Sequence, residues 1–229
     1  MDRTRYARIA GTALLIAVVS VLVLHIGPMA IGGTRASGTS DVARVTAFYS
    51  HPSMVPFWWS GGVAIVAIAV FAMSFRRYLG TFELSPLLRI TADAGAAITV
   101  GALPLYAIGS GLESAMVQLV AAGDAGKPAL LGVFVAWDWI YNSVAYWFEA
   151  GYMAAWAVVA WKSGALPRWI AAIGGLTALG HLFNSQVLVS GLSDDLTLIP
   201  TAMFVAWFIT AGVHLFRVAG SARPVAAAT

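Results

Sequence analysis

Six stretches of the chain are predominantly apolar over about 20 residues or more, and this feature restricts the fold more than any other. A helix rises ~1.5 Å per residue, so about 20 residues let it cross the ~30 Å hydrocarbon layer of a bilayer. Because backbone polar groups in lipid must be satisfied within their own segment, we expect helices in all six. The segments lie at about 9–31, 55–75, 86–109, 130–161, 167–189 and 196–217.

The composition supports the same fold class. Apolar residues make up 60% of the 229 positions and charged residues only 10%. A soluble globule of this size has too little interior to hide so much apolar surface. We therefore predict an all-α polytopic membrane helix bundle, a single transmembrane domain over residues 1–229. The absence of cysteine excludes disulfides and thiolate chemistry.

The start of the chain has two interpretations. A basic segment precedes the first apolar run, and Pro28-Met29-Ala30 resembles a weak signal-peptide cleavage site. The run continues through Ile31, is long enough to span, and is followed by further spans, so we expect a retained first helix. Ser85-Pro86, Pro167 and Ser193 have the pattern of helix starts.

The cations predict the orientation of the bundle. With a cytoplasmic N-terminus, ten of the thirteen Lys and Arg residues fall on the inside, and Arg35, Arg44 and Lys127 fall on the outside. This positive-inside bias predicts that both termini are cytoplasmic and that the protein is a multi-pass protein of the cell (inner) membrane. The ten inside cations are Arg3, Arg5, Arg8, Arg76, Arg77, Arg89, Lys162, Arg168, Arg217 and Arg223.

The segments between the spans are short. Residues 32–52 are polar and turn-rich and are expected to form an external loop. Residues 111–124 form either a short helix on the outer surface or an irregular loop, because Leu112 and Met116 share a helical face opposite Glu113. Two pairs of small residues, Ala97/Gly101 and Ala171/Gly175, predict close helix packing.

Three motifs are similar to those of a family of six-helix bacterial membrane proteins, which is defined only as a domain of unknown function. They are Arg8–Leu15 (RIAGTALL), Ser163–Ile170 (SGALPRWI) running on to Gly174-Gly175, and Trp207–Arg217 (WFITAGVHLFR). The resemblance implies a six-helix bundle and carries over no catalytic residue.

The fourth segment contains ionisable residues, which are costly inside a membrane and indicate a partner or a function. It reads VAWDWIYNSVAYWFEAGYMAAWAVVAW from Val135 to Trp161. Glu149 lies thirteen residues from Lys162, and His181 lies thirteen residues from Arg168, so both are roughly 20 Å from the inner face. We predict that Glu149 and His181 meet near the bilayer centre as an acid–base pair. A purely structural pair and two unrelated roles are the alternatives.

Further polar residues define a candidate ligand site around this pair. Asp138 lies roughly 36 Å from the inner face, which makes it an interfacial or entrance residue. Asp93 and His214 form a candidate second cluster near the inner boundary, where they either pair or reach headgroup water. The other candidate ligand-binding residues are His25, Asn142, Tyr146, Tyr152 and Asn184.

Four functions fit this pattern. The protein binds or modifies a lipid, isoprenoid or other small apolar ligand; it is a small proton-coupled transporter; it is a non-catalytic accessory subunit; or His25 and His181 bind haem or a metal. The first is preferred, without a decision that the protein is an enzyme, and no cofactor or metal site is predicted. Only the bilayer and such a ligand are expected partners. The spread of the cations gives no support to nucleic-acid binding, and Lys127 and Lys162 lie too near the membrane edges for a retinal Schiff base.

Overall fold

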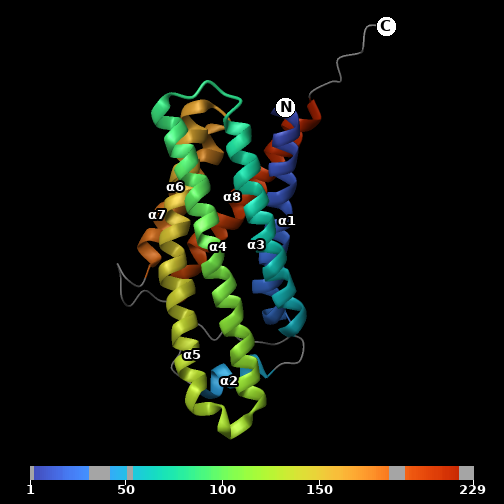
Figure 1. Ribbon diagram of the computed structural model, residues 1–229, viewed down its shortest axis with the longest axis vertical. Coiled ribbons are helices and arrows are strands. Elements are labelled where there is room, and N and C mark those ends of the chain that lie inside the picture. Colours follow the sequence, from blue (N-terminus) through green and yellow to red (C-terminus); the bar gives the residue numbers. More distant parts are fainter. Residues whose placement is uncertain (1–2, 31–41, 51–53, 186–193, 222–229) are drawn as a thin grey trace.

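The computed structural model describes residues 3–30, 42–50, 54–185 and 194–221, and every element in this part of the chain is helical (Figure 1). The longest single helix is α4, with 36 residues. The helices are α1 (Arg3–Ala30), α2 (Val42–Tyr49), α3 (Met54–Leu79), α4 (Pro86–Ala121), η1 (Gly123–Ala125), α5 (Lys127–Trp139), η2 (Ile140–Val144), α6 (Ala145–Ser163), α7 (Arg168–Asn184) and α8 (Asp194–Ser221).

Within the described residues, four helices are long and apolar enough to cross a membrane, which makes the chain a membrane-embedded protein. The stretches that qualify are Arg3–Val23, Ser60–Leu79, Pro86–Ala121 and Ile199–Gly220. The predicted fourth segment is also helical, because α5, the π-helical η2 and α6 follow one another without a break. The predicted fifth segment corresponds to α7, which has 17 residues.

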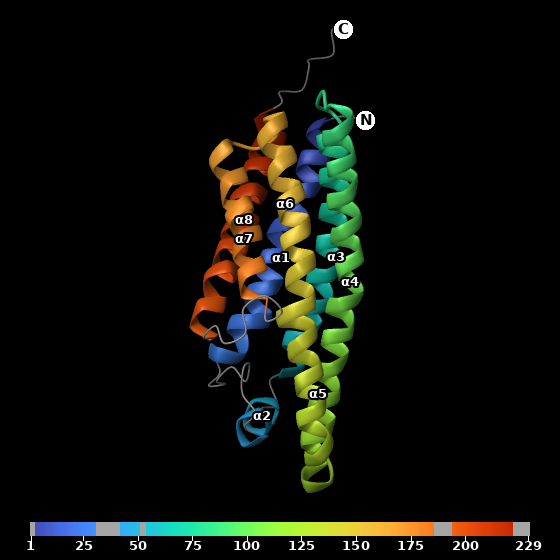
Figure 2. The same cartoon turned by 90° about the vertical axis from the view of Figure 1, so that its left-hand side faces the viewer.

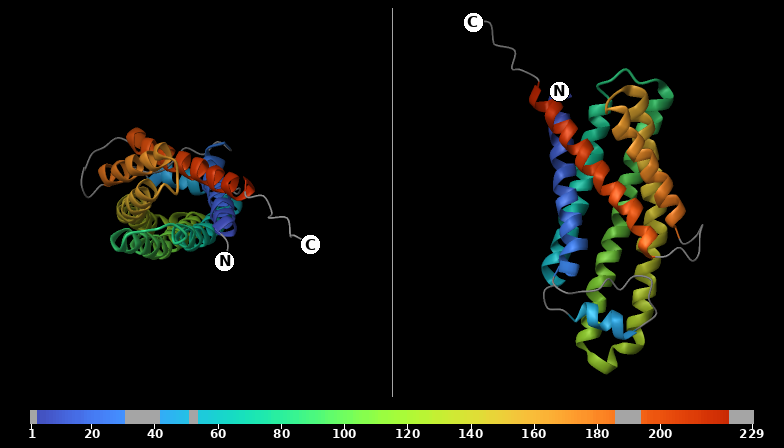
Figure 3. Two further views of the ribbon diagram at one scale, coloured as in Figure 1. Left: turned by 90° about the horizontal axis from the view of Figure 1, so that it is seen from above. Right: turned by 180° about the vertical axis from the view of Figure 1, so that it is seen from behind.

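The long helices form a closed ring in the order α1, α3, α4, α6, α7, α8, in which α8 returns to pack against α1. Figure 3 shows this ring from above and the diagonal course of α8 from behind. The start of α1, the α3–α4 and α6–α7 connections and the end of α8 lie together at the upper end in Figure 1.

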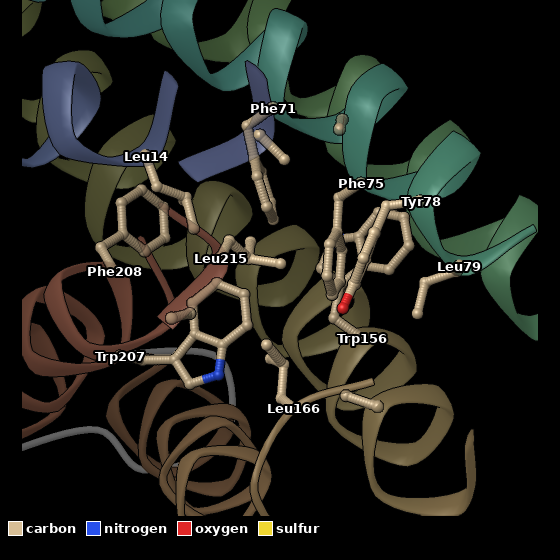
Figure 4. Close-up of a cluster of buried hydrophobic side chains, with 14 of the residues drawn as sticks. Leu14, Phe71, Phe75, Tyr78, Leu79, Trp156, Leu166, Trp207, Phe208 and Leu215 are labelled. Carbon is tan, nitrogen blue, oxygen red and sulfur yellow. The ribbon is translucent and has the colours of Figure 1, made fainter. Parts of the chain in front are cut away.

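Aromatic side chains fill the centre of the ring (Figure 4). Phe71 of α3 meets Trp207 of α8 edge-on at 6.0 Å between ring centroids, and Phe75 meets Trp156 of α6 at 5.3 Å. All four are essentially inaccessible to solvent. Each such pair contributes about 0.5–1.5 kcal/mol beyond the burial of area, so the core ties three non-sequential helices together.

The ring closes where α1 crosses α8. A Cβ atom added to Gly11 would lie 2.8 Å from the Gly212 carbonyl oxygen, and one added to Gly212 would lie 3.1 Å from the Leu15 side chain. Glycines at a helix crossing let the two backbones approach closely. The first and last of the three motifs described above therefore pack against each other.

The predicted start of the third segment is confirmed. The Leu88 amide donates to Ser85 Oγ at 3.3 Å, and Pro86 occupies the first turn of α4. Pro167 directly precedes α7, also as predicted. Ser193 lies outside the described residues.

The prediction of a separate surface helix or loop at residues 111–124 is wrong for most of this range, because α4 continues to Ala121. The reason is α5, which runs back along α4 and buries its apolar face. Met116 packs with Leu130 and Phe134 in a small apolar cluster, and α2 adds Val45 and Tyr49 to it. Residues 42–49 of the expected outer loop are thus helical, and 31–41 lie outside the described residues. Figure 2 shows α4, α5 and α2 extending beyond the other helices.

The first predicted small-residue pair is wrong, and the second is right only for Ala171, which is buried in the core. Ala97 and Gly101 are exposed on α4, and no atom lies within 4 Å of a Cβ added to Gly175. The close contact on α7 is at Gly174, where an added Cβ would lie 2.8 Å from Trp207 Nε1. The pattern predicted a close approach on α7 correctly but placed it one residue too far along, which rotates the contact by about 100°.

Candidate functional site

Glu149 and His181 meet inside the bundle, as predicted. Glu149 lies on α6 and His181 on α7, which are neighbours in the ring. His181 Nδ1 lies 2.9 Å from Glu149 Oε2, and the two residues are 2% and 9% exposed. Neither ring nitrogen of His181 makes a hydrogen bond of good angle to a described residue, so the contact is close but poorly aligned.

A third residue, Tyr106 of α4, contacts Glu149 from the opposite side of the carboxyl group. Its hydroxyl donates to Glu149 Oε1 at 2.6 Å, a short distance typical of a hydrogen bond to a carboxylate. The two carboxylate oxygens therefore contact different helices, Oε1 contacting α4 and Oε2 contacting α7. We call Glu149, His181 and Tyr106 the polar core.

Aromatic rings surround the imidazole of His181. Tyr146 meets it edge-on at 4.9 Å, and Phe204 of α8 does so at 5.6 Å. Tyr152, one turn after Glu149, lies 6.4 Å from Phe204. Aromatic rings, rather than bulk water, therefore surround the side chains of the pair. Trp147, in contrast, is 40% exposed and lies away from the polar core.

Several buried polar atoms at this level find no hydrogen-bond partner among the described residues. The clearest are Nδ2 of Asn184 and Nε2 of His181, whereas the Tyr152 hydroxyl lacks a well-aligned bond but is within hydrogen-bonding reach of Tyr106. Asn184 lies one turn after His181 on α7, and Tyr152 also interacts electrostatically with Glu149. Buried polar groups are nearly always partnered, so an unpartnered group indicates a partner from outside the protein.

The other predicted site residues are distributed differently. Asp138 lies half-buried at the end of α5, one residue before Trp139. His25 and Asn142 lie on α1 and η2, and their side chains are outside the described part of the structure. The π turn at Asn142 also shifts the helical register between Asn142 and Glu149, which the sequence interpretation did not include.

The predicted cluster of Asp93 and His214 is wrong. Asp93 forms an ion pair with Arg76 of α3 rather than with a residue of its own helix. His214 lies on α8, which packs against α1 and α7, whereas α4 packs against α3, α5 and α6. Both residues were predicted to lie near the inner membrane boundary. They belong, however, to helices on different sides of the ring.

A heptad pattern on α4 points to Tyr106 and was missed in the sequence. Polar residues recur at every seventh position, at Thr99, Tyr106 and Glu113. Small or apolar residues alternate with them at steps of three and four, as in a coiled-coil seam. These seven positions, which we call the α4 seam, are Gly95, Thr99, Ala102, Tyr106, Gly109, Glu113 and Met116.

Each polar residue of the α4 seam faces the α5–α6 segment. Thr99 accepts a hydrogen bond from Trp156 Nε1 at 3.2 Å, and Tyr106 donates to Glu149. Glu113 lies beside the indole of Trp137, although Oε2 of Glu113 and Nε1 of Trp137 are buried without a well-aligned hydrogen bond. The structure thus contains a second carboxylate that the sequence interpretation placed on an outer surface.

The described residues contain no group of three or more His, Asp or Glu side chains able to hold a metal ion. The arrangement suits proton exchange, because carboxyl and imidazole side chains are common general acids and bases and Tyr106 can donate to either form of the carboxyl group.

The chain has no match among protein-family models, curated proteins or solved structures. The resemblance to the six-helix bacterial membrane proteins therefore stays a prediction.

Proposed function

We propose that the protein binds a lipid, isoprenoid or other small apolar ligand within the bundle and that Glu149 and His181 act on it as an acid–base pair. The observation that carries this proposal is a pair of buried polar atoms, Asn184 Nδ2 and His181 Nε2, that have no hydrogen-bond partner among the described residues. A ligand with an apolar body and one polar group would satisfy these atoms and occupy aromatic surroundings.

The chemistry follows from the contacts of the carboxyl group. A proton can pass between Glu149 Oε2 and His181 Nδ1, which are 2.9 Å apart. Tyr106 keeps Oε1 in place during this exchange, because its hydroxyl donates to that oxygen in either protonation state. The ring edges of Tyr146 and Phe204 exclude bulk water from the imidazole.

The proposal includes a six-span topology in the inner membrane with both termini in the cytoplasm. The ends of the helices support it, because Arg3, Arg77, Arg89, Lys162 and Arg217 all belong to the end of the bundle where α1 begins and α8 ends (Figure 1). The 17 residues of α7 span about 26 Å, close to the hydrocarbon thickness. The same topology is implied by the resemblance to six-helix bacterial membrane proteins.

Proton-coupled transport is the second candidate. The observation that favours it is Glu113, which extends the line of protonatable groups from the polar core toward the other end of α4. A third function, that of an accessory subunit without a ligand, predicts that the polar core serves only to hold α4, α6 and α7 together.

The identity of co-purified molecules tests the proposal. The protein and its Glu149→Gln and His181→Ala variants are purified in the same lipid nanodiscs, and bound molecules are identified by mass spectrometry. We expect one class of molecule to be enriched with the native protein and lost from both variants. Glu83→Gln is the matched control, because Glu83 is an exposed acid between α3 and α4, and it should retain the molecule. The same composition in all four samples would contradict ligand binding.

A further inference from the structure

Glu113 is a partly buried acid that the function proposed above does not use. Its Oε2 atom is inaccessible to solvent and makes no well-aligned hydrogen bond to a described residue. Burying a carboxyl oxygen without a good hydrogen bond is costly. A purely structural role is therefore a weak explanation for it.

Tyr141 lies between Glu113 and Glu149. Its hydroxyl is within electrostatic reach of both carboxylates and within hydrogen-bonding reach of the Ser110 side chain. Its ring packs 5.4 Å from that of Trp137, the residue beside Glu113, and 6.2 Å from that of Tyr106, the residue bonded to Glu149. Tyr141 and Tyr106, whose rings are neighbours, thus lie in the region between the two carboxylates.

Gly109 makes this position of Tyr141 possible. A Cβ atom added to Gly109 would lie 1.9 Å from Cε2 of Tyr141, so any larger residue would displace the ring. Gly109 lies on the α4 seam between Tyr106 and Glu113. The ring of Tyr141 therefore lies directly against the α4 backbone, level with the gap between the two polar residues.

The line of groups leads from one membrane boundary to the middle. Glu113 is 24 residues from Arg89, which places it about 36 Å from the inner face if α4 is straight. Glu149 is at roughly 20 Å by the same reckoning. With a hydrocarbon layer of ~30 Å, Glu113 lies at the outer headgroups and Glu149 lies well within the lipid.

We propose that Glu113, Tyr141 and Tyr106 form a proton relay that connects the outer surface to Glu149, with Glu113 as the outer proton acceptor. This inference rests on the proposed acid–base role of Glu149. It adds the side of the membrane from which that residue exchanges its proton.

The relay changes only O–H bonds. A proton from outer water binds the Glu113 carboxylate and then passes to the oxygen of Tyr141, which releases its own proton toward Tyr106. Tyr106 gives its proton to Glu149 Oε1 and is reprotonated from Tyr141. No electron is transferred, and each hydroxyl ends with one proton, as it began.

Other titratable or charged groups on the neighbouring elements lie to the side of this line. Tyr49 belongs to the apolar cluster of α2, and Asp124 and Lys127 pair with each other at 2.6 Å at the tip of the hairpin. At the inner end, α8 contributes the uncharged ring of Phe204 beside His181. The remaining titratable groups near the line are Asp138, Tyr146, Tyr152 and His181.

The rate at which Glu149 takes up a proton tests the relay. Protein in nanodiscs is subjected to a rapid drop in pH, and the infrared C=O band of the protonated acid is followed in time. The Glu149 band is the one that Glu149→Gln removes. We expect Glu113→Gln and Tyr141→Phe each to slow its appearance by about tenfold or more, with the final amplitude unchanged.

Two controls and one rescue sharpen this experiment. Glu83→Gln removes an exposed acid, and Tyr78→Phe removes a buried hydroxyl that donates to the Ala165 carbonyl, so both should keep the native rate. Glu113→Asp retains a carboxyl group and should restore most of the rate lost in Glu113→Gln. A native rate in both Glu113→Gln and Tyr141→Phe would overturn the relay while leaving the acid–base role intact. A Glu149 band that never responds to pH would overturn both.

Discussion

The Tyr106 hydroxyl donates a hydrogen bond of 2.6 Å to Glu149 Oε1, although the two residues are 43 positions apart. The bond joins α4 to α6 in the interior of the helix ring. His181 of α7 contacts the other carboxylate oxygen. One carboxyl group thus links three helices.

The first prediction concerns this bond. Tyr106→Phe removes the donor and keeps the ring, so Glu149 Oε1 loses a partner without the creation of a large cavity. We expect the free energy of unfolding to fall by about 1–2 kcal/mol, between the value for an average membrane hydrogen bond and that for one to a charged group. Reversible unfolding in mixed detergent measures this change. In the Glu149→Met background, which lacks the acceptor oxygen, the same substitution should cost clearly less, and an equal cost in both backgrounds would show that the bond is not the cause.

The second prediction concerns the contact of Glu149 with His181. A double-mutant cycle with Glu149→Gln and His181→Ala isolates their interaction energy. We expect a coupling of less than about 1 kcal/mol, because Nδ1 is close to Oε2 but poorly aligned and Oε1 keeps Tyr106. A coupling above about 2 kcal/mol would instead identify the pair as a structural lock between α6 and α7.

The contact between Glu149 and His181 could be predicted because depth follows from counting residues along a helix. Lys162 and Arg168 mark the same boundary, and 1.5 Å per residue leads from each to the same level. Depth alone does not decide which helices are neighbours. Asp93 and His214 also had matching depths, yet α4 and α8 lie in different parts of the ring.

Glu113 was missed for a related physical reason. The run Gly109-Ser110-Gly111 has the composition of a helix end, so residues after it were assigned to the surface. The helix continues because α5 covers the apolar face that contains Met116. A tertiary contact thus overrides the local preference of the glycines, and the seven-residue recurrence of Thr99, Tyr106 and Glu113 is the signal that predicts it.

The third prediction compares two glycines of α4. Gly109→Ala brings a methyl group into the ring of Tyr141 and should lower the free energy of unfolding by about 1–3 kcal/mol, the usual cost of overpacking. Gly101→Ala is the matched control, because its nearest neighbour is an atom of Phe148 at 3.8 Å. Alanine favours helix by up to about 1 kcal/mol over glycine, so the control should be neutral or stabilising. Equal effects of the two substitutions would contradict the placement of Tyr141.

The fourth prediction uses adjacent glycines of α7. Gly174→Ala forces a methyl group toward Trp207 Nε1, at 2.8 Å, whereas Gly175→Ala meets no atom within 4 Å. We expect the melting temperature in detergent to fall for the first variant and to stay equal or rise for the second. If Gly175→Ala lowered the melting temperature and Gly174→Ala did not, the packed face of α7 would be the one that contains Gly175, as the sequence pattern predicted.

The last prediction tests the orientation of the bundle. The chain contains no cysteine, so a single introduced thiol reports the side of the membrane on which it lies. Glu83→Cys lies between α3 and α4, and Asp124→Cys lies at the opposite end, in η1; both positions are exposed. In intact cells an impermeant maleimide should label Asp124→Cys and leave Glu83→Cys unlabelled until the cells are lysed, because the positive-inside bias predicts a cytoplasmic location for Arg76, Arg77 and Arg89. Labelling of Glu83→Cys alone would invert the topology, and the proposed relay would then connect Glu149 to the cytoplasm.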